Sequence, residues 1–281
     1  MYKIVLLIIA SNIISTDAYA IMRALNIAAS GMSAQEQNVS TISNNIANAN
    51  TIGFKKSRAE FDDLLYETIQ APGSSSGTNS NYNVGIQIGS GAKLSGTRKE
   101  FTIGNPIVTN NPFDLMINGD GFFGITQDND KIRYTRDGAF NVNGQGMLVT
   151  KSGDPIYPGI TFPEGTKNVV IDKNGNIEAY LSNQVNAVKL GTLPVFTFAN
   201  PIGLQASGGN LYQASLSSGM AIEEVAGRNN AGNILQGTLE SSNVSIMTEM
   251  TNLIKAQRAY EMNSKVMGVA DQMLQTVNNI R

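Results

Sequence analysis

Large apolar residues recur every seven positions near both ends of the chain. Such spacing is typical of helices that pack along partner helices. It predicts one helix from Arg23 to Ala47 and a second that ends near Asn279, roughly 37 and 50 Å long. The rows are Leu25, Met32, Val39 and Ile46 with Ala28, Gln35, Ile42 and Ala49, and Ile246, Leu253, Tyr260, Met267 and Leu274 with Ala256, Ala270 and Val277, interrupted at Asn263.

Between the two heptad segments the pattern changes to short apolar runs separated by turn residues. Asp120-Gly121, Asp137-Gly138, Asn143-Gly144 and Asn174-Gly175 are each flanked by runs such as FFGI or VVI, which favours hairpins. We expect one all-β domain over residues 93–217, followed by a return linker over residues 218–241. Phe61 to Ile69 has the spacing of a short amphipathic helix, and a glycine- and serine-rich loop follows it. The predicted class is α+β, with a coiled coil of terminal helices and a central β domain.

The first predicted helix ends in an unusual cluster of asparagines. Asn44, Asn45, Asn48 and Asn50 are followed by Gly53 and Phe54. Asparagine and glycine tolerate the left-handed conformation that ends many helices, and amides can bind the last free carbonyls. One asparagine would serve an ordinary helix end. Four indicate a crowded joint between the helix and the β domain, and we expect neighbouring subunits to touch there.

Composition removes most enzymatic chemistry. Cysteine and histidine are both absent, which excludes thiol nucleophiles, most zinc sites and the commonest general base. A net charge of −2, with no basic run longer than Lys55-Lys56, gives no footprint for nucleic acid. The segment GSGAKLSG lacks the spacing of a phosphate loop, and Asp128-Asn129-Asp130 lacks the rest of a calcium loop. We expect no catalytic residue, metal, cofactor or small-molecule substrate.

The first 21 residues follow a different pattern. A lysine, an apolar run from Ile4 to Ala10 and the sequence Ala18-Tyr19-Ala20 match a secretory signal peptide with its cleavage site. The alternative is an upstream extension of the reading frame, because a clean new pattern starts at Met22.

The two heptad helices have more apolar surface than one chain can cover. An all-β domain of this size fills its own core, and the longer helix would overhang the shorter one. At about 1.5 to 3 kcal/mol for each large apolar side chain buried, their rows represent more than about 10 kcal/mol. The pattern therefore predicts self-assembly, or terminal segments that order only on assembly.

Four motifs give the chain a specific resemblance. NNIANANTIGFKK at 44–56, MINGDGFFGI at 116–125, YTRDGAFNVNGQGMLVT at 134–150 and SNVSIMTEMTNLIKAQRAYEMNSKVMGVADQMLQT at 242–276 resemble the bacterial flagellar rod and hook proteins. The likeness runs from Met22 to the end of the chain. FDDLLYETIQAPG with VGIQIGSG, within residues 61–91, resembles the segment that marks the distal-rod branch of that family. The hook branch lacks this segment, and the proximal-rod branch is smaller.

The resemblance implies a structural role. Members of the family stack helically into a hollow shaft that crosses the periplasm, transmits torque and lets later subunits pass through its lumen. The implied partners are further copies of the chain, proximal rod proteins, the hook protein, surrounding ring proteins and the flagellar type III export apparatus. The coiled coil would line the tube, with the uncharged polar face at Ser33, Gln37 and Asn44 suiting a lumen.

The resemblance also implies roles for other segments. Family members leave the cell without a cleaved signal peptide and begin where Met22 stands, which favours the upstream extension for residues 1–21. Phe61 and Leu65 fit the pattern proposed for recognition of early substrates at the export gate. The alternatives are a hook or proximal-rod paralogue, a secreted carboxylate-dependent hydrolase and a surface adhesin. The expected parts are residues 1–21, the helix and turn 22–60, the rod-specific segment 61–92, the β domain 93–217, the linker 218–241 and the helix 242–281.

Overall fold

A computed structural model describes residues 2–73, 75–77, 80–81, 83–127, 131–182 and 186–279, with residues 2–20, 75–77, 80–81 and 277–279 described by their backbone alone. The chain forms two compact units, and each is described by itself. The helical unit contains Met1–Asn44, Ser57–Arg98 and Met247–Arg281. The β unit contains Asn45–Lys56 and Lys99–Ile246.

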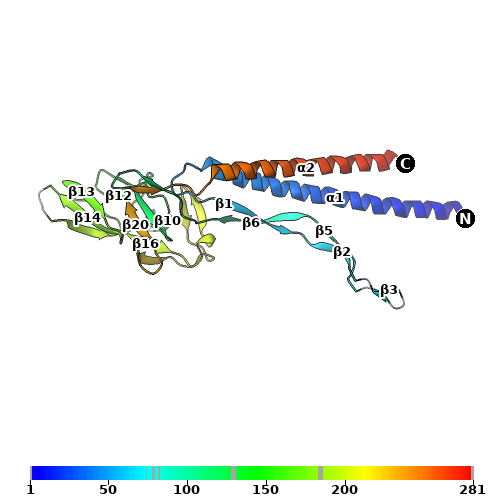
Figure 1. Ribbon diagram of the computed structural model, residues 1–281, viewed down its shortest axis with the longest axis horizontal. Helices are drawn as coiled ribbons and strands as arrows, with labels where there is room; N and C mark the ends of the chain where they lie inside the picture. The colour runs from blue at the N-terminus through cyan, green and yellow to red at the C-terminus, as the bar shows by residue number, and fades with distance from the viewer. Residues whose placement is uncertain are drawn as a thin grey trace. The chain divides into compact units, whose positions relative to one another are not determined.

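Two long helices, α1 (Tyr2–Ala47) and α2 (Ile246–Asn279), run side by side (Figure 1). α1 ends at the expected Ala47, and α2 extends to Asn279, the last residue that the structure describes. However, α1 begins 21 residues before the expected start at Arg23. Residues 2–20 contain neither proline nor glycine, so nothing in the sequence interrupts the helical backbone there.

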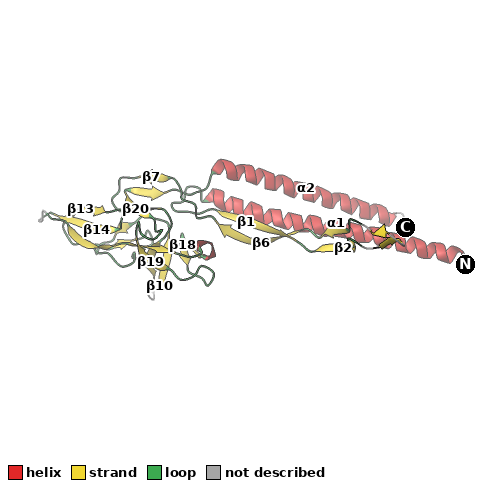
Figure 2. Cartoon of the chain, turned by 60° about the horizontal axis from the view of Figure 1, so that its bottom comes forward, coloured by secondary structure: helices red, strands yellow, loops and turns green. Residues whose placement is uncertain are grey.

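A two-stranded ribbon accompanies the helices in the same unit. Its part around β1 and β6 lies beside α1 (Figure 2), where a Cβ added to Gly91 would overlap Ser30. In the ribbon β1 pairs with β6, β2 with β5 and β3 with β4. The strands are β1 (Ser57–Asp63), β2 (Tyr66–Gln70), β3 (Ser75–Gly77), β4 (Ser80–Asn81), β5 (Ile86–Gly89) and β6 (Ala92–Lys99).

The ribbon contradicts the helix predicted over Phe61 to Ile69. That prediction placed the apolar residues of this segment on one buried face, but Leu65 is 90% exposed and Ile69 is 59% exposed. Without a buried face the helical spacing has nothing to pack against. The aromatic and β-branched residues from Tyr66 onward instead favour the extended backbone of β2.

The β unit holds the remaining strands in several small sheets. The largest has the order β17-β18-β10-β9, and a second has the order β13-β14-β15. Its strands are β7 (Pro106–Val108), β8 (Leu115–Asn118), β9 (Phe123–Gln127), β10 (Lys131–Thr135), β11 (Asn141–Val142), β12 (Leu148–Val149), β13 (Thr166–Ile171), β14 (Asn176–Leu181), β15 (Val188–Thr192), β16 (Pro194–Thr197), β17 (Gln205–Gly208), β18 (Leu211–Gln213), β19 (Ile222–Val225), β20 (Asn233–Gln236) and β21 (Thr238–Glu240), with the short helix η1 (Pro201–Gly203).

Two apolar clusters form the core of this unit. The larger one joins β8 and β9 to β13, β14 and β20, and includes Leu115, Phe123 and Ile177, each fully buried. The smaller one is aromatic and contains Phe122, Tyr134, Phe196, Leu204 and Tyr212. Several of its rings meet edge to face, for example Tyr134 and Phe196 with centroids 5.3 Å apart.

The β unit differs from its expected boundaries at both ends. Residues 218–241, expected as a linker, contain β19, β20 and β21, which pair with β16, β8 and β7. Ala226 and Ile234 in this segment are buried in the larger core. At the other end, residues 93–98 belong to the ribbon. The glycines of residues 218–241 are typical of a linker, which is why a linker was expected. The short apolar runs between these glycines instead form strands.

Candidate assembly surfaces

The predicted heptad rows lie on the faces of α1 and α2 that have the least exposure. Ile42 is buried, whereas most other row members are half-buried. Ile246 and Tyr260 are exceptions, with 51% and 44% exposure. The half-buried members are Leu25, Met32, Val39, Ile46, Leu253, Met267 and Leu274.

Small residues bring the two helices together. Ala28 on α1 and Ala256 and Ala270 on α2 are buried. Asn263, which interrupts the apolar row, lies over Gly31, where an added Cβ would come within 2.7 Å of its Nδ2. The interruption is therefore a packing feature, because the amide occupies the space that the glycine leaves.

A different face of α1 carries small and polar side chains. Asn26, Ser33, Gln37, Ser40 and Asn44, the residues expected to be polar and outward, are all exposed. Their spacing of three, four and seven residues keeps them on one stripe of the helix. Glu36 is the one charged residue among the exposed positions of α1 from residue 22 to residue 47.

The asparagine segment folds as a series of tight turns in the β unit. The helix ends at Ala47, and the backbone amides of Asn48, Ala49 and Thr51 each bond to the carbonyl three residues earlier. Asn45 is 1% exposed, and the hydroxyl of Thr51 bonds to Asn48 Oδ1 at 3.2 Å.

The left-handed residue of this segment is Gly53. Neither Asn48 nor Asn50 has a positive φ, although asparagine tolerates that conformation, whereas Gly53 has φ +67°. An added Cβ on Gly53 would lie 2.6 Å from the backbone carbon of Arg136. The backbone hydrogen bonds of the consecutive turns are formed without a left-handed asparagine. The left-handed conformation occurs at Gly53, because glycine has no Cβ to clash there.

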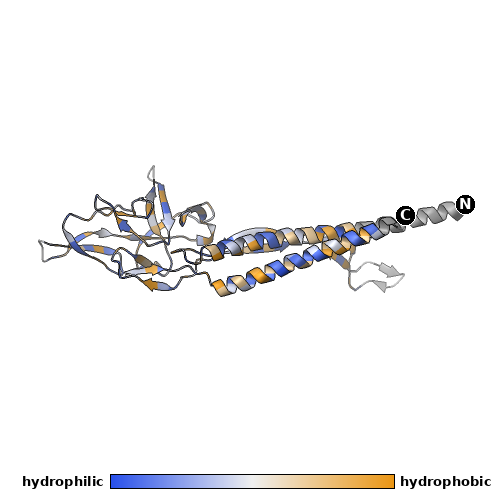
Figure 3. Cartoon of the chain, turned by 90° about the horizontal axis from the view of Figure 1, so that it is seen from above, coloured by the Kyte–Doolittle hydropathy of each residue, from blue (hydrophilic) through white to orange (hydrophobic). Residues whose placement is uncertain are grey.

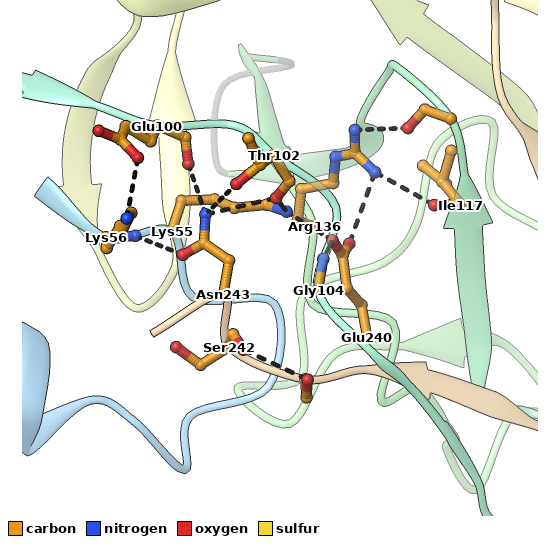
Figure 4. Close-up of polar contacts among 12 residues, drawn as sticks. Lys55, Lys56, Glu100, Thr102, Gly104, Ile117, Arg136, Glu240, Ser242 and Asn243 are labelled. Carbon is orange, nitrogen blue, oxygen red and sulfur yellow. Dashed lines mark hydrogen bonds and ion pairs between the residues drawn. The ribbon is translucent and has the colours of Figure 1, made fainter. Parts of the chain in front are cut away.

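A buried ion cluster follows directly after the asparagine segment (Figure 4). Lys55 Nζ lies 2.5 Å from Glu240 Oε1, and Arg136 Nη1 lies 3.5 Å from Glu240 Oε2. Lys55 is fully buried, Glu240 is 1% exposed and Arg136 is 2% exposed. We call these three residues the clasp. They join the segment after α1, the β domain and the segment before α2.

Hydrogen bonds to the main chain add to the clasp, although the buried Nε of Arg136 has no hydrogen-bond partner among the described residues. Lys55 Nζ donates to the carbonyl of Thr102 at 2.6 Å, and Gly104 N donates to Glu240 Oε1 at 2.9 Å. Arg136 donates to the carbonyls of Ile117 and Gly119. The Glu240 carbonyl accepts from Gly53 N at 2.8 Å. Buried charges are tolerated when they are paired and bonded in this way.

Asn243 ties the same segments a second time. Its Oδ1 accepts from Lys56 N at 2.8 Å, and its Nδ2 donates to the Glu100 carbonyl at 2.8 Å (Figure 4). Lys56 and Glu100 also form an ion pair at 3.0 Å. The residues just after α1 and just before α2 are thereby fixed to the same part of the β unit.

The charges in the clasp do not cancel, because two cations, Lys55 and Arg136, lie at contact distance from one carboxylate, Glu240. Burial lowers the pKa of Lys55, and Glu240 opposes that shift. Burial likewise lowers the pKa of Arg136, opposed by Glu240 and Asp120. Glu240 is therefore the group on which both buried cations depend.

The residues proposed for export recognition lie on the ribbon. Phe61 is on β1 and is 38% exposed, and Leu65 follows that strand. Their exposure leaves both side chains available for contact in the folded chain.

The described residues contain little that suggests catalysis. In those ranges, no group of three or more acidic, histidine or cysteine side chains is arranged to hold a metal ion. Among the helices searched over the same ranges, none has the length and apolar composition needed to cross a membrane. Asp128-Asn129-Asp130, considered as a calcium loop, lies outside the described residues.

Comparisons with known proteins agree with the motifs. Residues 25–55 match the family model "Flagella basal body rod protein", residues 116–179 match "Flagellar hook protein FlgE/F/G D1 domain", and residues 235–280 match "Flagellar basal body rod FlgEFG protein C-terminal". These matches cover α1 from Leu25 onward, all of α2 and the centre of the β unit.

Full-length relatives share most of the chain. A flagellar basal-body rod protein FlgG of Caulobacter vibrioides is 44% identical over 92% of this chain and 100% of its own length. The FlgG proteins of Borreliella burgdorferi and Bacillus subtilis are 42% and 35% identical, each over 92% of this chain and 99% of their own length. The alternative of a carboxylate-dependent hydrolase has no support in these similarities. The chain belongs to the FlgG family of flagellar basal-body rod proteins, which are structural components of the basal body and not enzymes.

Proposed function

We propose that copies of this chain assemble helically into the distal rod, the part of the flagellar shaft between the proximal rod and the hook. In this role the subunit transmits torque, and the hollow shaft carries later subunits outward. The observation that supports the proposal best is the amount of apolar side chain that α2 leaves exposed. Large exposed apolar surfaces on a protein mark sites of protein association.

The heptad rows would be completed on assembly. Row members such as Leu253 and Met267 are only half-buried in the single chain. Each large apolar side chain gains about 1.5 to 3 kcal/mol when it is fully buried. Neighbouring copies would supply that burial and tighten the helix pair into the coiled coil that the heptad spacing predicts.

The polar stripe of α1 is the surface we assign to the lumen. Unfolded subunits that pass through the channel expose both apolar and charged groups. A channel wall that binds them only weakly should therefore be neither apolar nor charged. The stripe of exposed small and uncharged residues, centred on Ser33 and Gln37, has that chemistry.

The remaining proposed partners are the proteins that would adjoin a subunit of the distal rod. We propose that the chain contacts proximal rod proteins at one end, the hook protein at the other, and the surrounding ring proteins through its β unit. Phe61 and Leu65 would be read by the export apparatus before the subunit folds. The asparagine joint with Gly53 and Phe54 would lie at a contact between successive copies.

Assembly of the purified full-length chain tests the proposal. We expect filaments above a threshold concentration, seen by sedimentation and electron microscopy. Leu253→Asp should abolish them, because a carboxylate would enter the half-buried helix face, while tyrosine signals of the β unit stay unchanged. Thr251→Asp, on an exposed position of the same helix, is the matched control and should assemble. A wild-type chain that remains monomeric at all concentrations would count against the proposal.

A further inference from the structure

The exposed apolar residues of α2 form two separate groups. The first group, near the start of the helix, contains Met247, Met250 and Ile254, which are 78%, 44% and 49% exposed. The second group, farther along, contains Met262, Val266, Val269 and Met273, which are 67%, 49%, 49% and 51% exposed. Figure 3 shows apolar and polar residues alternating along both helices, as expected when more than one face is apolar. We call these groups the first flank and the second flank.

The two flanks face different directions. Met247 and Ile254 each come one position after a row residue, Ile246 and Leu253, and Met250 follows Glu249, which lies seven positions before Ala256 of the companion row. The residues of the second flank each come one position before a row residue, as Val266 precedes Met267. One position along an α-helix is a rotation of about 100°. The first flank therefore lies on one side of the face turned to α1, and the second flank lies on the other side.

Each flank is apolar over only part of the helix. Farther along α2, the side of the first flank carries polar or small residues: Gln257, Glu261, Ser264, Gly268, Asp271 and Gln275. Near the start of α2, the side of the second flank carries Thr248, Asn252, Lys255 and Ala259. An apolar contact between the two sides of parallel helices therefore requires an axial shift.

The second flank borders a groove. Its volume is about 390 Å³, and Ala24 of α1 contributes to its lining. Ala270 forms part of its floor, and Lys265 lies at the groove as well. The small side chains of Ala24 and Ala270 leave room for large side chains from outside. The first flank, with two methionines and one isoleucine, presents side chains of that kind.

We propose that the first flank of one copy packs into the second-flank groove of the next copy, with the α2 helices parallel and axially shifted. The middle of the first flank is Met250 and the middle of the second is near residue 267, so the shift is roughly 25 Å at 1.5 Å per residue. This inference rests on the proposed self-assembly. It specifies which surfaces meet and in what register.

A second copy fits the groove because one helix carries both complementary surfaces. The two surfaces differ and point in different directions, so the contact is heterologous. Each added copy then presents a free groove to the following one, and the contact propagates into an open polymer. A closed pair of antiparallel helices would need both flanks on the same face, which α2 does not have.

Disulfide cross-linking tests the contact, because the chain has no cysteine of its own. Met250→Cys and Val266→Cys are made separately and together, and filaments of the full chain are oxidised. We expect the mixture of single variants to give cross-linked dimers. The double variant should give a ladder of trimers and larger species, because every copy then has both ends of the contact.

Other outcomes would overturn the proposal. A double variant that stops at dimers indicates a closed pair. Cross-linking of Met250→Cys to Asn252→Cys in place of Val266→Cys indicates helices without the axial shift. Filaments that form but do not cross-link at either pair refute the contact and leave self-assembly intact. If the unmodified chain forms no filament, the proposed function fails first. The pair Ile254→Cys and Val269→Cys repeats the test if the first pair blocks assembly.

Discussion

Replacement of Glu240 by glutamine is the most informative change in the clasp. The two side chains have the same shape, so packing is kept while the negative charge is lost. Lys55 and Arg136 would then remain buried with no opposing charge at contact distance. Removing one partner of a buried ion pair costs roughly 3 to 5 kcal/mol. A domain of ordinary stability has about 5 to 15 kcal/mol in total, so the loss should be severe.

The charge count of the clasp predicts an order among its variants. Lys55→Met removes one of two cations and leaves Glu240 paired with Arg136 and bonded to Gly104 N, so it should cost less than Glu240→Gln. The exposed pair of Lys151 and Asp137, with atoms 3.5 Å apart and Lys151 59% exposed, is the control. Lys151→Met should cost less than about 1 kcal/mol.

Urea unfolding of the full chain measures these differences. The chain has no tryptophan, so near-ultraviolet circular dichroism, which depends on ordered aromatic side chains, reports mainly on buried tyrosines such as Tyr134 and Tyr212 of the β unit. The free energy of unfolding should fall in the order wild type, Lys151→Met, Lys55→Met, Glu240→Gln. A free energy of unfolding for Glu240→Gln within about 1 kcal/mol of the wild type, or a Lys55→Met variant less stable than Glu240→Gln, would refute this order.

Two further predictions concern the joint and the aromatic core. Gly53→Ala should lower the free energy of unfolding of the β unit by at least about 1 to 2 kcal/mol, because φ is +67° and the new Cβ meets the main chain of Arg136. Gly144→Ala is the control: open space surrounds Gly144, so this change should cost less in the same urea assay. Burial raises the pKa of Tyr212 to about 12. The unfolded chain therefore loses this proton first, near pH 10, and stability of roughly 2 to 3 kcal/mol should disappear as the pH rises from 10 toward 12. Tyr212→Phe should lack this loss when unfolding is compared at pH 9 and pH 11, and an identical loss in both proteins would contradict the assignment.

The helices were predictable because their signal is periodic and local. The heptad rows predict the end of α1 at Ala47, and they extend along α2 to the last residues that the structure describes. The start of α1 was not predictable from the rows, because residues 2–20 continue the helix without continuing the repeat.

The ribbon was missed because it has no buried face along much of its length. Side-chain patterns report burial, and residues such as Leu65 and Tyr66 are exposed in the single chain. Turn dipeptides were a partial guide to the β unit. Asn174-Gly175 connects the paired strands β13 and β14, but Asp120-Gly121 follows β8, whose partner is β20.

The clasp could not be found from spacing. Lys55 and Glu240 are separated by 185 positions, and no periodic signal links residues so far apart. In the sequence Lys55 resembles an ordinary surface cation beside Lys56. Only the fold of the β unit brings the segments next to α1 and α2 together and reveals that this lysine is fully buried.

Electron microscopy of purified basal bodies shows directly whether copies of this chain build the distal rod. A short epitope inserted at the exposed turn beside Asn174 would be labelled with antibody in otherwise intact cells. If copies of this chain build the distal rod, the label should repeat along the shaft between the proximal rod and the hook. Labelled protein that is absent from the shaft, or present there as a single copy, would contradict the account.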